Sequence, residues 1–184
     1  MTHSENYLSE TAELAYRLDF WKIEQMADAL SKCSGRVYVI GLGGSLANAI
    51  HFAADLRKLC KLDATAFDNI AELTARANDD GFQTIFDGWL SRLNDRDILF
   101  VLSVGGGAEH VSEGITWAVT EAKRKEARIL GVVGPIGGIT AELGDIVLKV
   151  PAAQRITPHA EAFQAVVWHC IVSHPCLQKQ ATKW

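Results

Sequence analysis

The 184-residue sequence has no long apolar run, no excess of basic residues and few cysteines. No apolar run approaches the roughly 20 residues that a membrane-spanning helix needs, and the polar, acidic N-terminus lacks the apolar stretch of a signal peptide. The 18 Lys and Arg residues are outnumbered by 22 Asp and Glu residues, which argues against a basic face for a phosphate backbone. We therefore expect a cytoplasmic protein that binds neither membranes nor nucleic acid.

The four cysteines have none of the spacings found in zinc ribbons or disulfide-rich domains. Cys33, Cys60, Cys170 and Cys176 lie far apart or among apolar neighbours, and no Cys-x-x-Cys pair occurs. Such cysteines are typical of reduced thiols in the core of a cytoplasmic protein. A chain of this length buries about 70% of its unfolded surface, so its fold requires neither disulfides nor a structural metal.

Hydrophobic periodicity predicts the order of the elements. Apolar residues at helical spacing over residues 7–32 indicate one or two amphipathic helices. Four apolar runs of strand length follow, with glycine-rich turns and helical segments between them. The predicted strands are residues 36–40, 98–102, 128–133 and 146–150.

These elements predict an α/β fold. Strands that are apolar throughout and alternate with helices form parallel sheets covered on both faces. We therefore expect a three-layer αβα sandwich with a parallel, about five-stranded, flavodoxin-like sheet. Residues 1–184 would form a single domain, with a helical extension over 1–34 and an α/β core over 35–184. Thr157 as N-cap and Pro158 as the first helical residue predict a last helix from Pro158 to about Ser173.

Two predicted strands end in loops rich in glycine and serine. The first runs into Gly41-Leu-Gly-Gly-Ser45, and the second into the segment from Ser103 to Ser112. In open parallel sheets, ligands bind at the carboxyl ends of strands, where backbone N–H groups at helix N-termini are exposed. Neither loop fits a dinucleotide fingerprint or a P-loop, so no nucleotide cofactor is expected. Each loop alone is equally well explained as a tight turn, but together they favour a small molecule with one phosphate.

Ionisable residues recur on two predicted helices. His51 and Asp55 are four residues apart and share one face of the helix after the first loop. Glu161 and His169 share one side of the last helix, which is otherwise strongly apolar. Because buried ionisable groups are costly unless they are paired or bound to metal, the four could hold a divalent metal such as zinc or form an acid/base pair. The alternative is that the two histidines are hydrogen-bonded core residues.

The order and spacing of these motifs resemble the sugar isomerase (SIS) domain family, and within it the phosphoheptose isomerases. The family's Gly-Asn-Gly-Gly-Ser loop and the His-Phe-Ala segment after it are similar to Gly41-Leu-Gly-Gly-Ser45 and His51-Phe-Ala-Ala-Asp55. Its Asn-Asp-x-Gly-Phe segment is similar to Asn78-Asp-Asp-Gly-Phe82. The resemblance covers most of the chain.

This resemblance implies an activity and an assembly. The reaction is the aldose–ketose isomerisation of sedoheptulose 7-phosphate to D-glycero-D-manno-heptose 7-phosphate through an enediol. The implied assembly is a homotetramer with active sites between subunits, in which the helices over residues 1–34 serve oligomerisation.

The resemblance also implies roles for individual residues. Asp55 and His169 would be catalytic, and a zinc ion would be bound by His51, Asp55, Glu161 and His169. The implied substrate-binding residues are Gly43, Gly44, Ser45, Asn78, Asp79, Ser103, Gly105, Ser112 and Glu161.

Several positions depart from the family pattern. Leu42 replaces the loop Asn, Asp55 replaces a Glu, and Glu161 replaces a Gln and so adds a negative charge that favours a cation. The second loop has fewer hydroxyls than in the family, and Ser112 is expected to cap the next helix while facing a phosphate. These departures leave two alternatives open: an isomerase of another phosphosugar, or a non-catalytic SIS module that acts as a sugar-phosphate sensor or adaptor.

Overall fold

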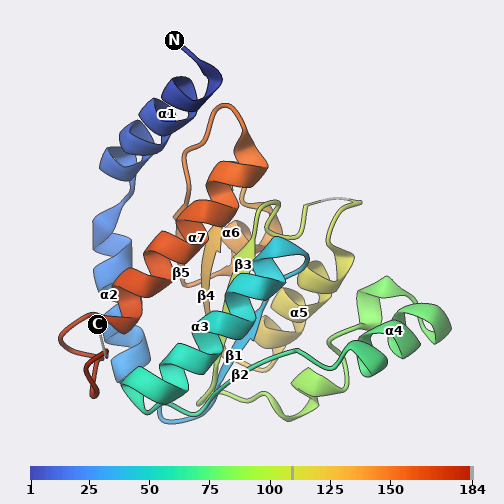
Figure 1. The fold of residues 1–184 in the computed structure, drawn as a ribbon. Coiled ribbons are helices and arrows are strands. Elements are labelled where there is room, and N and C mark those ends of the chain that lie inside the picture. The colour runs from blue at the N-terminus through green and yellow to red at the C-terminus, as the bar shows by residue number, and fades with distance from the viewer. Residues whose placement is uncertain (109, 183–184) are drawn as a thin grey trace.

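The computed structural model describes residues 1–108 and 110–182, which contain a five-stranded sheet of order β2-β1-β3-β4-β5 (Figure 1). All four strand pairs are parallel. The strands are β1 (Val37–Ile40), β2 (Ala64–Ala66), β3 (Ile98–Ser103), β4 (Arg128–Val133) and β5 (Ile146–Lys149). The α/β class and the parallel sheet are thus confirmed. The edge strand β2 is not among the strands predicted from sequence, because three residues give no recognisable apolar run.

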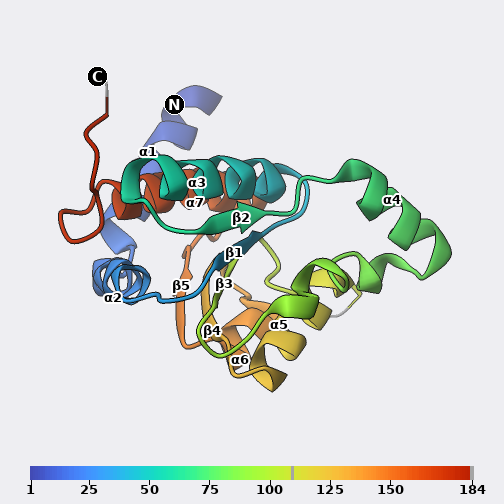
Figure 2. The same ribbon diagram turned by 90° about the horizontal axis from the view of Figure 1, so that it is seen from below.

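Helices cover both faces of the sheet (Figure 2). One face carries α2 (Phe20–Ser31), α3 (Gly44–Cys60) and α7 (Ile156–Val172), and the other carries α5 (Glu113–Arg124) and α6 (Gly138–Leu143). Each face has its own buried cluster. Leu99 and Phe100, neighbours on β3, belong to opposite clusters because side chains alternate between the two faces of a strand. The predicted three-layer sandwich is therefore confirmed.

Two helices project from this sandwich. α1 (His3–Arg17) begins with a capping box between Thr2 and Glu5 and passes beside the N-terminal end of α7 (Figure 1). α4 (Ile70–Asp79) has no buried residue and points away from the sheet (Figure 2). Two 3₁₀ turns, Phe82–Thr84 and Trp89–Arg92, lead from α4 back to β3.

The start of the last helix differs from its prediction. α7 begins at Ile156 with Arg155 as its N-cap, and Arg155 has a positive φ of 45°. Thr157 is therefore not the cap, and Pro158 is the third helical residue rather than the first. Proline still fits there, because the N–H groups of the first turn have no partner within a helix.

The prediction that all four cysteines lie in the core is wrong for two of them. Cys60 is buried and Cys33 half-buried, but Cys170 and Cys176 are exposed. Cys170 lies on the outer side of α7, and Cys176 lies in the segment that follows this helix. In the described part of the chain, no helix combines the length and apolar character needed to cross a membrane.

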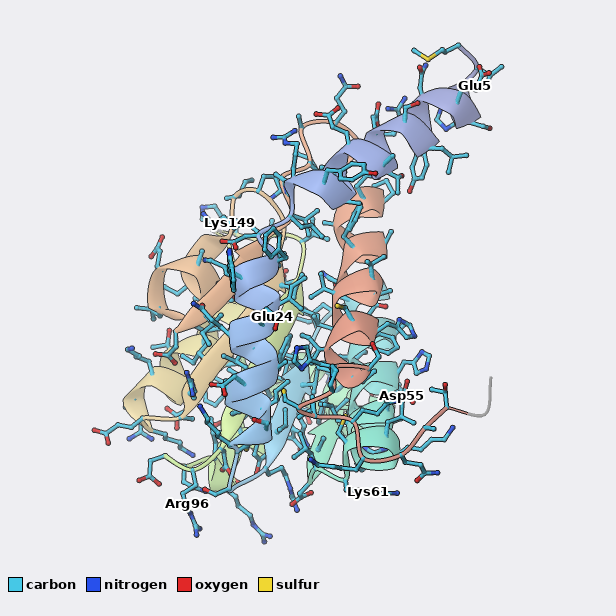
Figure 3. The ribbon with its side chains drawn as sticks, turned by 90° about the vertical axis from the view of Figure 1, so that its left-hand side faces the viewer. Glu5, Glu24, Asp55, Lys61, Arg96 and Lys149 are labelled. Atoms are coloured by element: carbon cyan, nitrogen blue, oxygen red, sulfur yellow. The ribbon has the colours of Figure 1, made fainter. Side chains whose placement is uncertain are left out.

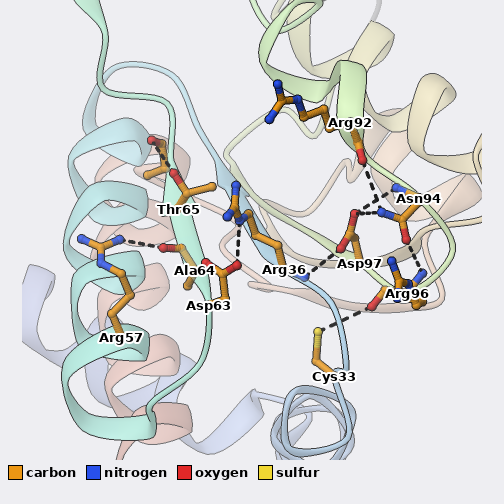
Figure 4. A network of polar contacts seen from close by, with 11 residues as sticks. Cys33, Arg36, Arg57, Asp63, Ala64, Thr65, Arg92, Asn94, Arg96 and Asp97 are labelled. Atoms are coloured by element: carbon orange, nitrogen blue, oxygen red, sulfur yellow. Dashed lines mark hydrogen bonds and ion pairs between the residues drawn. The ribbon is translucent and has the colours of Figure 1, made fainter.

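A polar network joins the amino ends of β1 and β3 (Figure 4). The buried carboxylate of Asp97 accepts hydrogen bonds from the backbone N–H groups of Arg36, at 2.7 Å, and Asn94, at 2.9 Å. A third hydrogen bond to this carboxylate comes from the Asn94 side-chain NH₂, at 2.7 Å. This network holds the two central strands together at one end of the sheet, and the glycine loops leave the sheet at the other end.

Candidate active site

The two glycine loops lie next to each other at the carboxyl ends of β1 and β3. These strands are parallel neighbours, with Ile40 opposite Val101. The chain leaves β1 toward β2 on one side, whereas β3, β4 and β5 extend on the other. This reversal of strand order creates the crevice in which open α/β sheets bind their ligands. The fold therefore places both predicted loops at a binding position.

The first loop depends on glycine. Gly43 has φ 60° and ψ −127°, a conformation that side chains disfavour, and Gly44 begins α3. A Cβ atom on Gly44 would lie 2.4 Å from a carboxylate oxygen of Glu161. Glu161 therefore faces this loop from α7, beside the buried Ser45. The structure brings Gly43, Gly44, Ser45 and Glu161 together, as the sequence predicts.

The second loop is organised by its own hydroxyl and carbonyl groups. The buried Ser103 accepts a hydrogen bond from the Gly106 N–H at 3.0 Å. The Gly106 carbonyl in turn accepts hydrogen bonds from both the N–H, at 3.0 Å, and the hydroxyl, at 2.8 Å, of Thr140 on α6. Ser112 is the N-cap residue of α5, as predicted, but its φ is 61° and its side chain makes no capping hydrogen bond. The expected capping by the Ser112 hydroxyl is therefore wrong.

Three of the predicted site residues meet where α3 and α7 lie side by side. The His51 Nε2 atom is 3.6 Å from an oxygen of Asp55, one turn along α3. One ligand atom from each of His51, Asp55 and His169 lies within 4.8 Å of the others. Figure 3 shows Asp55 close to α7. All three are among the metal ligands expected from the sequence, and the packing of α7 along α3 brings His169 to the His51–Asp55 pair.

Trp168 supports both imidazoles of this cluster. Its buried ring stacks on His169, with ring centroids 3.5 Å apart, and meets His51 edge to face at 4.6 Å. The indole N–H donates to the side-chain oxygen of Asn48 at 3.5 Å. Sequence reasoning missed both Trp168 and Asn48. The available signals were adjacency to His169 and the three-residue spacing from Asn48 to His51 on one helix face.

Asn48 also fixes how α7 lies along α3. Its side-chain NH₂ donates to the Glu161 carbonyl at 3.0 Å and to the side-chain oxygen of the buried Gln164 at 3.3 Å. With the two helices held in this way, the first residues of α3 lie against Glu161, and the middle of α3 lies against His169. The two α7 residues are separated by about 12 Å along the axis, since a helix rises 1.5 Å per residue. For this reason Glu161 does not join the cluster of His51, Asp55 and His169.

A backbone contact fixes the proton position on His169. Its Nδ1 atom lies 2.8 Å from the carbonyl oxygen of Ala165, so Nδ1 carries the donated proton. The Nε2 atom then keeps its lone pair for a metal ion or a proton. This is the usual way in which a protein prepares a histidine ligand.

The cluster is on the surface of the single chain. The side chain of His51 is 60% exposed and that of Asp55 17%, and His169 is exposed. The alternative of core histidines is therefore wrong for His51 and His169. His159 is the buried histidine of α7: it stacks on Tyr7 and contacts the carboxylate of Glu10 at 2.9 Å.

The structure keeps Asn78 and Asp79 apart from this cluster. Both are exposed at the end of the projecting α4, where the Asn78 side chain donates to Asp79 at 2.7 Å (Figure 2). A cavity of about 720 Å³ between α5 and α6 borders the second loop, but none of the predicted site residues lines it. The candidate site is thus an open face of this chain.

The donor set fits a divalent metal. Two imidazole nitrogens and one carboxylate oxygen are ligands that zinc accepts, and catalytic zinc sites use three protein ligands and keep a fourth position open. His51, Asp55 and His169 supply that set within 4.8 Å.

A family model described as the SIS domain matches residues 6–134, more than half of the chain. The chain belongs to the SIS domain family. Among the relatives of this SIS protein, the phosphoheptose isomerase of Syntrophotalea carbinolica is 31% identical over 178 residues, which cover 90% of this chain and 88% of the relative. The resemblance seen in the motifs is therefore confirmed.

Solved structures of phosphoheptose isomerases share the fold of the SIS protein. GmhA from Neisseria gonorrhoeae has a TM-score of 0.81 and 26% identity, with 92% of each chain covered. The enzyme from Francisella tularensis has a TM-score of 0.80 and 29% identity, with 97% of this chain and 95% of that chain covered. Because these matches cover 92% and 97% of this chain, nearly all of its fold is shared with solved phosphoheptose isomerases.

Proposed function

We propose that this protein isomerises sedoheptulose 7-phosphate to D-glycero-D-manno-heptose 7-phosphate through an enediol. The observation that carries this proposal is the meeting of His51, Asp55 and His169 beside two glycine loops at the carboxyl edge of the sheet. Membership of the SIS family and the similarity to phosphoheptose isomerases support it.

The glycine loops bind the phosphate in this proposal. Backbone N–H groups at Gly43, Gly44 and Gly105 can approach an anion closely because glycine has no side chain. Ser45, Ser103 and Ser112 add hydroxyl groups at the same edge of the sheet. The Ser112 hydroxyl makes no capping bond to α5, which supports a role toward the ligand.

The α3–α7 cluster carries out the proton transfers. In an aldose–ketose isomerisation, a proton leaves one of the carbons C1 and C2 and is added to the other, while protons also move between their oxygens. The Asp55 carboxylate and the Nε2 atom of His169 divide these transfers between them, since both can accept and return a proton. The hydrogen bond from Nδ1 to the Ala165 carbonyl keeps Nε2 of His169 directed away from its own helix.

Zinc is the metal we propose for this site, and His51, one oxygen of Asp55 and Nε2 of His169 are its candidate ligands. Nε2 has a single lone pair, so His169 transfers protons only while it is not a zinc ligand. When bound, it would polarise the substrate carbonyl and stabilise negative charge on the enediolate. Glu161 lies against Gly44, so in this chain we assign it to the substrate rather than to the cation. As an additional metal ligand, Glu161 would have to turn its carboxylate toward the cluster.

The complete site lies between subunits of a homotetramer in this proposal. The cluster is exposed, and so are two apolar side chains on the same helices: Ile50 is 39% exposed and Val166 55%. Asn78 and Asp79 lie apart from the cluster, on α4. A second copy of the chain would cover the apolar residues and supply the missing contacts. The projecting α1 and the neighbouring α2, within residues 1–34, would serve this assembly. The four free cysteines support a cytoplasmic location.

The direct test is to incubate the purified protein with sedoheptulose 7-phosphate, with and without added zinc, and to follow the aldose by NMR. We expect conversion that zinc increases. Conversion of a different ketose phosphate, with no conversion of sedoheptulose 7-phosphate, would establish another substrate. This is the main alternative, because Leu42 and the second loop depart from the family pattern. No conversion of any phosphosugar would favour the sensor or adaptor alternative.

A further inference from the structure

Three side chains outside the candidate active site form a chain of polar contacts at the C-terminal end of α7. The Cys176 Sγ atom lies 2.9 Å from Nδ1 of His174, and Nε2 of the same ring lies 2.9 Å from a carboxylate oxygen of Glu24 on α2. Figure 3 shows Glu24 on the side of α2 that faces this end of α7. A nucleophile, a base and a group that orients the base are thus in contact in that order.

The contacts around His174 determine which nitrogen carries its proton. The Cys176 backbone N–H donates to Nδ1 at 3.2 Å, so Nδ1 is an acceptor. Nε2 therefore carries the ring proton and donates a hydrogen bond to the Glu24 carboxylate. The lone pair of Nδ1 also faces the Cys176 Sγ atom at 2.9 Å, so Nδ1 can take the thiol proton in exchange for the weaker hydrogen bond from the backbone N–H.

The backbone holds this arrangement in place. Leu177, the residue after the thiol, is 1% exposed. The N–H groups of Leu177 and Gln178 both donate to the His174 carbonyl at 2.9 Å, and those of Lys179 and Gln180 donate to the Leu59 carbonyl at 2.8 and 3.0 Å. Ordering of the backbone on both sides of the thiol keeps Sγ beside the imidazole.

The other three thiols have different surroundings. The thiols of Cys33 and Cys60 donate hydrogen bonds to the backbone carbonyl oxygens of Arg96 and Val172, respectively, and a backbone carbonyl cannot serve as a base. Burial also raises the pKa of Cys60 to about 11. Cys170 is exposed like Cys176, but partial burial and then the charge of Glu24 raise its pKa. Cys170 therefore serves as a matched control within the same molecule.

We propose that Cys176 is a nucleophilic modification site that exchanges with low-molecular-weight disulfides, with His174 as its base and Glu24 as the residue that orients the base. Sγ attacks one sulfur of the small disulfide, whose S–S bond breaks as the new S–S bond forms. The thiol proton passes to Nδ1 of His174 and then to the thiolate that leaves. The products are a mixed disulfide on Cys176 and one free small thiol, and the small disulfide is the oxidant. Cys176 is exposed, so the disulfide can reach it.

The test uses the full-length protein, reduced and then incubated with glutathione disulfide, with the adduct on each cysteine followed over time by peptide mass spectrometry. We expect Cys176 to be modified at least about tenfold faster than Cys170. His174→Asn and Glu24→Gln should each slow modification of Cys176 by about tenfold or more. His174→Asn should leave the rate at Cys170 within about twofold, and Glu24→Gln, which removes a charge that raises the pKa of Cys170, should not slow modification of Cys170.

Matched variants control for changes in folding and surface charge. Asp28→Asn removes another exposed carboxylate from α2, one turn after Glu24, and His3→Asn removes an exposed histidine; both should leave the Cys176 rate unchanged. Thermal unfolding identifies any variant that has lost its structure, and Cys176→Ser shows that the adduct is assigned to the correct thiol. Equal rates at Cys170 and Cys176, or a Cys176 rate that His174→Asn leaves unchanged in a folded protein, would overturn the proposal.

Discussion

The Nδ1 atom of His169 lies 2.8 Å from the carbonyl oxygen of Ala165, one turn earlier on α7. This single contact fixes the tautomer of a residue that stacks on Trp168 and faces His51. It leaves Nε2 as the only nitrogen of His169 that can bind a metal or a substrate proton. The properties of the candidate site can therefore be tested by removing its members one at a time.

His169→Ala should abolish most of the activity with little loss of stability. The variant removes the Nε2 atom to which we assign a proton transfer, and such groups contribute at least about 100-fold. The side chain is exposed, so its removal should change the free energy of unfolding by less than about 1 kcal/mol. Measured kcat/KM and urea unfolding check both statements, with His3→Ala as the control. A destabilised protein with normal turnover per folded molecule would contradict the assignment.

Asp55→Asn should weaken zinc binding, because it removes the only carboxylate of the three-residue cluster. The loss should be at least the roughly 10- to 100-fold that removal of an outer-shell partner costs in other metal sites. Asp55→Glu restores the negative charge and should recover much of the affinity. Calorimetric titration with zinc measures both variants, with Asp63→Asn as an exposed control. Unchanged affinity in Asp55→Asn would exclude this residue as a ligand.

Asn48→Ala should destabilise the protein by about 1–3 kcal/mol, because the buried side-chain oxygen of Gln164 and the indole N–H of Trp168 would lose their partner. The free energy of unfolding in urea is the measurement. Asn78→Ala, which removes an exposed amide bound only to its neighbour, should cost about 0.5 kcal/mol or less. Equal effects from the two substitutions would show that Asn48 does not hold α3 and α7 together.

The contact between α1 and α7 should weaken in acid. Hydrogen bonds from His159 and then Arg155 lower the pKa of Glu10 below its ordinary value. A carboxyl group whose pKa is lower in the folded state stabilises the fold above its unfolded pKa of about 4.3, and this contribution is lost as the pH falls below that value.

Glu10→Gln should accordingly lose less stability than the parent protein between about pH 5 and pH 3. The comparison is made from urea unfolding curves across this range. Glu13→Gln, which removes an exposed carboxylate from the same helix, should keep the acid dependence of the parent. Identical pH dependence in Glu10→Gln and the parent would refute the role of this contact.

Much of this molecule follows from the sequence alone. Apolar strand runs, glycine turns and helical spacing are local patterns, so they determine the parallel α/β class and the positions of the two glycine loops. The spacing of His51 and Asp55 likewise determines that they share a helix face, because one turn of an α-helix separates them.

Only the tertiary structure decided which distant residues meet. The packing of α7 along α3, fixed by Asn48, places His169 in the cluster and leaves Glu161 about 12 Å away along the helix axis, against Gly44. The same packing leaves His51 on α3 and His169 on α7 exposed, although both could have been core residues of buried helices. It also brings the segment after α7 against α2, so that His174 reaches both Cys176 and Glu24. Such contacts depend on the relative placement of whole helices, which no local pattern encodes.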